Sequence, residues 1–167
     1  FEEPLKVSQA LMEFTVSQDV IAVPKLVFST PDTEFEATAR VELSGDDPET
    51  QVSATFGTFP ATRLIALWPL SAASGGRAWI ERNIKGGSIE SGSLSWRSKG
   101  ADEDFSVAFR FAGLTGVAVD GMTPITSAYG AGLATLDAFK LNLEAGVVDL
   151  GDAGVLALGG SSFELPG

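Results

Sequence analysis

Apolar and polar residues alternate along much of this chain, and the alternation predicts β-strands. The cleanest stretch runs from Glu34 to Ser44. Its apolar side carries Phe35, Ala37, Ala39, Val41 and Leu43, and the intervening residues are charged or carry a hydroxyl. A period of two over this length predicts a strand with one dry face and one face in water.

The same alternation returns in the second half of the chain. Its apolar positions are Phe105, Val107, Phe109 and Phe111 in one stretch, and Phe139, Leu141 and Leu143 in another. Glycine-containing turns, among them one expected at Ala145-Gly146, separate the stretches at short spacing, which is typical of an antiparallel meander. Near the N-terminus the stretch from Val20 to Ser29 contains Pro24, which fits an edge strand or a β-bulge better than a central strand.

One segment, from Phe59 to Gly87, has helical spacing instead. Pro60 can begin a helix because the first helical position needs no N–H. Pro69 stops or kinks the helix, and Gly86 with Gly87 can end a second one. We therefore expect a kinked helical pair at about 60–86, packed on the sheet. The expected anchors are Trp68, Trp79 and Ile80.

These elements together predict a mainly β protein. We expect a curled antiparallel sheet that leaves a half-open groove, with the apolar residues on its concave side and the helical pair at one end or side. Residues 1–167 are expected to form a single domain. Because the chain begins at Phe1 without a start signal, we interpret it as a fragment of a longer, elongated protein. No run approaches the ~20 apolar residues that a membrane-spanning helix needs, so any membrane anchor is expected outside these residues.

The charge of the chain argues against two kinds of partner. With 22 acidic and 11 basic residues the net charge is −11. Phosphate backbones are repelled by such a chain, so we expect no nucleic acid partner. The same charge disfavours broad contact with an anionic membrane surface. The acidity itself is most simply a source of solubility.

Cysteine and histidine are both absent, which removes most common catalytic and metal-binding chemistry. There are no disulfides, no thiolate ligands and no imidazole base. The acidic cluster at Asp46, Asp47 and Glu49 is interrupted by Pro48 and fits a solvated turn better than a calcium loop. We therefore expect no enzymatic activity, no metal and no cofactor.

A short signature within the helical segment resembles that of the AsmA-like superfamily. Its members here are Leu67-Trp68-Pro69, Arg77-Ala78-Trp79-Ile80, Asn83 and Gly87. They are similar to the W-P, R-x-W-I, N and G positions of YhdP-type and TamB-type proteins of Gram-negative bacteria. The run from Gly121 to Leu143 is similar to the repeating β segments of that group. The resemblance covers most of residues 35–167.

This resemblance implies a bridge-like lipid transport protein of the cell envelope. Such a protein lies in the periplasm, is anchored in the inner membrane outside this segment, and serves outer membrane biogenesis. The implied partners are phospholipid acyl chains and neighbouring repeats of the same parent chain. No catalytic residue is implied.

The aromatic strand faces are where such a lipid would lie. The candidate groove residues are Phe35, Val41, Leu43, Phe105, Val107, Phe109, Phe111, Phe139, Leu141 and Leu143. The same residues also suit a closed core. A one-faced sheet needs a cover, and a short helical pair cannot cover many strands. The alternative function is therefore a structural or adhesive β-sandwich that binds protein partners.

Overall fold

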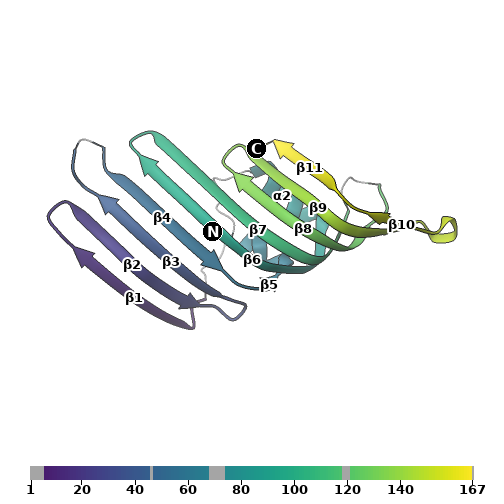
Figure 1. Ribbon diagram of the computed structural model, residues 1–167, viewed down its shortest axis with the longest axis horizontal. Coiled ribbons are helices and arrows are strands. Elements are labelled where there is room, and N and C mark those ends of the chain that lie inside the picture. Colours follow the sequence, from purple (N-terminus) through teal and green to yellow (C-terminus); the bar gives the residue numbers. More distant parts are fainter. Residues whose placement is uncertain (1–5, 46, 68–73, 118–120, 167) are drawn as a thin grey trace.

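The protein is one open antiparallel sheet with a short helical segment on one face (Figure 1). The computed structural model describes residues 6–45, 47–67, 74–117 and 121–166. The spatial order of the strands is β1-β2-β3-β4-β6-β7-β8-β9-β10, with β5 paired to β6 and β11 paired to β9. The sheet is not closed into a barrel, so the predicted fold class, a mainly β, open antiparallel meander, is confirmed.

The elements have the following bounds. The first six strands are β1 (Gln9–Val16), β2 (Val20–Ser29), β3 (Glu34–Glu42), β4 (Glu49–Phe56), β5 (Phe59–Pro60) and β6 (Ile84–Lys99). The remaining strands are β7 (Asp102–Gly116), β8 (Ile125–Thr135), β9 (Ala138–Asp149), β10 (Val155–Leu158) and β11 (Ser161–Pro166). The helical elements are η1 (Ala61–Arg63), α1 (Leu64–Leu67), α2 (Ser74–Asn83) and η2 (Gly151–Ala153).

The strand predictions hold with one difference, in β9. Pro24 lies where the register of β2 shifts between Val23 and Leu26, as expected for a proline at a bulge. The turn that we expected at Ala145-Gly146 is wrong, because β9 continues through it. Gly146 is buried and a Cβ there would lie 3.2 Å from Ile125, so this glycine allows close packing between strands.

The helical segment ends earlier than predicted. α2 stops at Asn83, and the next residue already belongs to β6. The side chain of Asn83 is buried, and its Nδ2 donates a hydrogen bond of 2.8 Å to the carbonyl oxygen of Trp79. This bond satisfies one of the carbonyls that a helix leaves without a partner at its C-terminus. Residues 68–73, which include the predicted anchor Trp68 and the predicted kink at Pro69, lie outside the described residues.

Gly87 therefore does not end a helix. Its φ is +103°, and a Cβ at this position would lie 2.6 Å from the Cα of Leu114. Only glycine combines that backbone conformation with so close an approach of β6 to β7.

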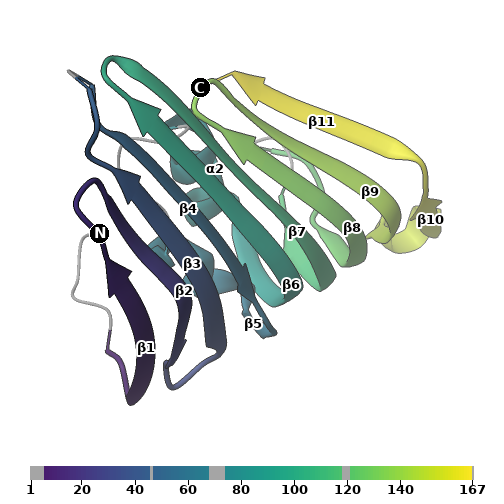
Figure 2. The same cartoon turned by 60° about the vertical axis from the view of Figure 1, so that its left-hand side comes forward.

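α2 lies on one face of the sheet, against its C-terminal half (Figure 2). Ile80 is the buried anchor, with 3% of its surface exposed, whereas Trp79 is only half-buried and contacts Phe139 at a ring distance of 6.1 Å. Gly76 brings the helix backbone down onto the sheet, since a Cβ there would lie 2.5 Å from the Cβ of Phe139. No helix within the described part of the chain has the length and apolar character needed to cross a membrane.

Candidate functional site

The two faces of the sheet differ sharply in chemistry, and the strand register defines them. Residues directly opposite each other in antiparallel strands lie on the same face. Phe35 of β3 is opposite Phe56 of β4, and the same face continues to Phe109 of β7 and Leu141 of β9. We call this side, which also carries α2, the apolar face, and the other side the polar face.

The apolar face is closed beneath α2. Four of the predicted groove residues are buried there: Phe109, Phe111, Phe139 and Leu141. The rings of Phe109 and Phe139 stack with their centroids 6.4 Å apart. In this half of the sheet the predicted apolar side chains therefore form a core, together with residues of η1, α1 and α2.

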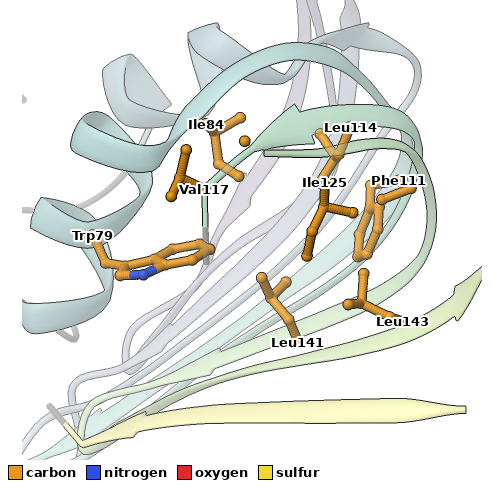
Figure 3. A pocket seen from close by; sticks show the side chains of 10 residues that line it. Trp79, Ile84, Phe111, Leu114, Val117, Ile125, Leu141 and Leu143 are labelled. Carbon is orange, nitrogen blue, oxygen red and sulfur yellow. The ribbon is translucent and has the colours of Figure 1, made fainter. Parts of the chain in front are cut away.

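A small apolar pocket remains at the edge of this core (Figure 3). Its volume is about 50 Å³, which is room for about one or two water-sized groups. It is lined by Trp79, Ile84, Phe111, Leu114, Gly116, Val117, Ile125, Ala128, Leu141 and Leu143. Figure 3 shows the indole of Trp79 on one side and Leu141 and Leu143 on the other. The pocket offers no polar side chain that would fix a headgroup, and it suits the end of a hydrocarbon chain.

A row of phenylalanines connects the core with the N-terminal half of the sheet. Phe28 and Phe35 stack with centroids 4.7 Å apart. Phe35 and Phe56 lie at 6.0 Å, and Phe56 and Phe59 at 5.6 Å. Phe59 belongs to the core under the helical segment. The apolar face is thus continuous from Phe28 on β2 to the core under the helical segment.

Beyond this row no described part of the chain covers the apolar face. The main contacts of the helical segment are with β6, β9 and β11. Among the side chains left half-buried or exposed on the same face are Met12, Phe14, Val16, Ile21, Val23, Leu26, Ala39, Val41, Val52, Ala54, Leu94 and Trp96. We call this set the open strip. The exposed fraction reaches 66% at Val16.

The other predicted groove residues divide between these regions. Phe35 and Phe105 are buried, and Val41, Val107 and Leu143 are half-buried. Leu43 lies beyond the end of β3 and 47% of its surface is exposed, because the strand stops at Glu42.

The polar face carries hydroxyl and charged side chains and is hollowed over β3, β4, β6 and β7. The hollow has a volume of about 500 Å³. Its polar-face lining is Glu36, Thr38, Ser53, Thr55, Ser93, Ser95, Ser106 and Ala108. We expected the concave side of the sheet to carry the apolar residues, and over these strands this hollow lies on the opposite side. The twist of a large sheet produces such saddle shapes.

A charge cluster borders this hollow. Glu49 accepts hydrogen bonds from Gln51 Nε2 at 2.7 Å and Arg97 Nε at 2.9 Å, and Lys99 Nζ lies 3.3 Å from its other oxygen. These donors, Gln51 and Arg97 foremost, lower the pKa of Glu49 to about 2. Glu49, one member of the acidic cluster that was predicted as a solvated turn, therefore belongs to β4 and is paired with Arg97 and Lys99.

A second ion pair crosses a whole strand of the polar face. Arg110 of β7 donates from Nη2 to Glu144 of β9 at 2.8 Å. The residue opposite Arg110 on the intervening strand is Ala131, which is small enough to be spanned. The hydrogen bond and charge of Arg110 lower the pKa of the Glu144 carboxyl. No group of three or more acidic side chains in the described ranges is placed to hold a metal ion.

Several residues of the apolar face were missed from sequence. Phe28, Phe56 and Phe59 were not grouped with the other phenylalanines, and Val52, Leu94 and Trp96 were not assigned to the same face. Alternation at Val52, Ala54 and Phe56 was a usable signal. Their alignment with the other strands depends on the register, which the sequence pattern does not provide.

Comparison with known proteins finds no counterpart: no protein-family model, curated protein or solved structure matches the chain.

Proposed function

We propose that this chain is a lipid-binding segment of a bridge-like transport protein, and that acyl chains lie on its apolar face. The observation that carries the proposal is the open strip. Apolar side chains continue from the core across β6, β4, β3, β2 and β1, and no element among the described residues covers them. Contiguous exposed apolar surfaces of this kind mark sites of interaction.

The dimensions of the open strip suit hydrocarbon chains. A strand of seven residues is ~20 Å long, and five neighbouring strands span ~19 Å. Each methylene that the strip removes from water contributes about 0.8 kcal/mol to binding. These contributions add up along the acyl chain and need no specific contact with the headgroup. Such binding therefore suits a mixture of phospholipids.

The side chains within the open strip support this interpretation. Val52 lies between Ala39 and Trp96, and all three are apolar. The adjacent residue Ser53 points to the polar face. A lipid therefore has one face on which to lie, and the headgroup can remain at the strip's margin in water.

The small pocket beside Trp79 adds a place for the end of a chain. It opens next to the closed core and, apart from the indole N–H of Trp79, is lined by apolar groups. The proposal involves no covalent step, since binding and release of hydrocarbon need only burial and exposure of apolar surface. The periplasmic location and the inner-membrane anchor of a parent protein are part of the proposal and rest on the resemblance to the AsmA-like superfamily.

The test places a charge on the open strip and the same charge on the other face of the same strand. The variants are Val52→Glu and Ser53→Glu, which are neighbours on β4 with opposite orientation. Lipid bound to the purified proteins is extracted and measured by mass spectrometry. We expect phospholipid with the wild type and with Ser53→Glu, and a loss of about tenfold or more with Val52→Glu, because a carboxylate must be desolvated under hydrocarbon.

Circular dichroism and a denaturant melt serve as the control for folding. Val52 is half-buried, so a glutamate there can reach water in the free protein. Equal lipid content in the two glutamate variants, both folded, would overturn the proposal. A wild-type protein that carries no lipid and takes none up from phospholipid vesicles would overturn it as well.

The alternative, a β-sandwich that binds protein partners, requires a second sheet. The described residues form one sheet only. A protein partner recovered on the open strip in place of lipid would favour that alternative.

A further inference from the structure

The open strip has one polar end and one aromatic end. At the polar end, the neighbouring strands β4, β6 and β7 place Thr50, Ser98 and Glu103 opposite one another on the apolar face. At the other end of β4 lies Phe56, which belongs to the row of phenylalanines that leads into the core. A phospholipid has the same asymmetry, because its headgroup is polar and its acyl chains are not. A lipid that lies along β4 and β6 therefore has its headgroup at the polar end.

Glu103 is the charged group at this end of the strip. The register places its neighbours Asp102 and Asp104 on the polar face, opposite Lys99 and Arg97, so the three acidic residues do not act together. Glu103 is the one charged side chain on the apolar face of the described strands β1 to β4 and of the adjoining segments 92–99 and 102–111. It is also exposed, so a headgroup can reach it.

Trp96 orients the carboxylate of Glu103. The indole Nε1 of Trp96 donates a hydrogen bond of 2.8 Å to Oε1 of Glu103, which leaves Oε2 for another donor. All 11 Lys and Arg residues of the chain lie in the described ranges, and none of them forms an ion pair with Glu103. The carboxylate is thus held by an indole and is not paired with a basic residue of its own chain.

The two hydroxyls beside Glu103 are also available. Thr50 and Ser98 are half-buried, and within the described part of the chain neither hydroxyl takes part in a hydrogen bond. Neighbouring strands lie ~4.8 Å apart, so one headgroup can contact Glu103 and Ser98 together. A hydroxyl both donates and accepts hydrogen bonds. The polar end therefore combines one anionic acceptor with donors for a second, negatively charged group.

We propose that this polar end binds the headgroup of a phosphatidylethanolamine, with its primary ammonium on Glu103 and its phosphate on the hydroxyls of Ser98 and Thr50. The inference rests on the proposed function, because it places the headgroup of a lipid whose acyl chains lie on the open strip. An ammonium carries several N–H donors, and a hydrogen bond between charged groups is stronger than one between neutral groups. The positive charge also complements a chain with a net charge of −11.

Other phospholipid headgroups fit this end less well. The quaternary ammonium of phosphatidylcholine has no N–H to donate to Glu103. Phosphatidylglycerol has no cation and brings only a negative charge to the carboxylate. Binding to the open strip needs no headgroup contact, so the contact with Glu103 adds a preference. Because exposed ion pairs are worth little in water, we expect this preference to be about threefold.

The test uses vesicles that contain phosphatidylethanolamine, phosphatidylcholine and phosphatidylglycerol in equal amounts and with the same acyl chains. After incubation the protein is separated from the vesicles by gel filtration, and its bound lipids are measured by mass spectrometry. Glu103→Gln removes the charge and keeps an acceptor for Trp96. Asp104→Asn is the matched control, because it removes the same charge from the other face of the same strand.

We expect the wild type and Asp104→Asn to enrich phosphatidylethanolamine about threefold over each of the other two lipids. Glu103→Gln should bind the same total amount of lipid in the proportions of the vesicles. Glu103→Lys should instead enrich phosphatidylglycerol, since it places a positive charge at the same exposed position.

The remaining outcomes separate this inference from the proposed function. A wild type that takes up no lipid contradicts both. Lipid taken up in the proportions of the vesicles leaves the proposed function standing and overturns the headgroup site. Enrichment that survives in Glu103→Gln or Glu103→Lys, or that Asp104→Asn abolishes as well, also overturns it. Equal enrichment of phosphatidylcholine and phosphatidylethanolamine rejects a site for a primary ammonium.

Discussion

The ring of Phe109 on β7 lies across the backbone of Gly132, the residue directly opposite it on β8. The ring occupies the space that a Cβ at position 132 would need. Phe56 lies on Gly92 in the same way. Aromatic rings that cover strand glycines supply the packing that glycine lacks, and here they let large rings fit between closely spaced strands.

This relationship predicts that Gly132→Ala destabilises the protein. The new methyl group must displace the buried ring of Phe109, and overpacking of this kind costs about 1–3 kcal/mol. Gly86→Ala is the control, because nothing lies within 4 Å of a Cβ at that strand position. Denaturant melts of both variants measure the difference. Equal stability of the two would mean that the ring is not fixed on the glycine.

A second prediction concerns the C-terminus of α2. Asn83→Leu keeps the size of the buried side chain but removes the donor to the carbonyl oxygen of Trp79. Leaving that carbonyl without this donor should cost about 1–3 kcal/mol in the free energy of unfolding. Arg82→Leu, at the exposed neighbouring position, should change it by less than about 0.5 kcal/mol. A neutral Asn83→Leu would show that the hydrogen bond does not hold the helix end.

A third prediction follows from Glu49. Its pKa falls from 4.5 to about 2 on folding, chiefly through hydrogen bonds from Gln51 and Arg97. A lowered pKa of an acid stabilises the folded state above the unfolded pKa, and this stabilisation is lost as the pH falls through the folded pKa. We therefore expect the stability difference between wild type and Glu49→Gln to be constant above pH 4.5 and to shrink between pH 4.5 and about 2. Urea melts across this range measure it, and a difference that does not vary with pH would contradict the assigned contacts.

The alternation of residues predicted the strands and the two-faced sheet well. Phe35 to Val41 and Phe105 to Phe111 each place their apolar residues on one face, as expected. This success has a local cause, because a period of two is set within a single strand.

The predictions that were wrong depended on contacts between strands. Gly87 was interpreted as a helix end, and its real role is the close approach of Leu114. Gly146 was interpreted as a turn and lies inside β9. Whether an apolar residue is covered also depends on where α2 lies: Phe109 is buried beneath the helix, whereas Val52, two strands away on the same face, is only half-buried. Sequence pattern alone could not separate core from open strip.

The central claim is that acyl chains lie on the open strip, and Trp96 can report this directly. Trp96 is half-buried on that strip, opposite Val52, and its Nε1 donates to Glu103 at 2.8 Å. Phospholipids brominated in their acyl chains quench tryptophan on contact. The fluorescence of Trp96 is obtained as the difference in tryptophan emission between wild type and Trp96→Phe. The account predicts that this difference is strongly quenched by brominated phospholipid and unchanged by the unbrominated lipid; quenching that is the same in wild type and Trp96→Phe, or absent from both, would contradict it.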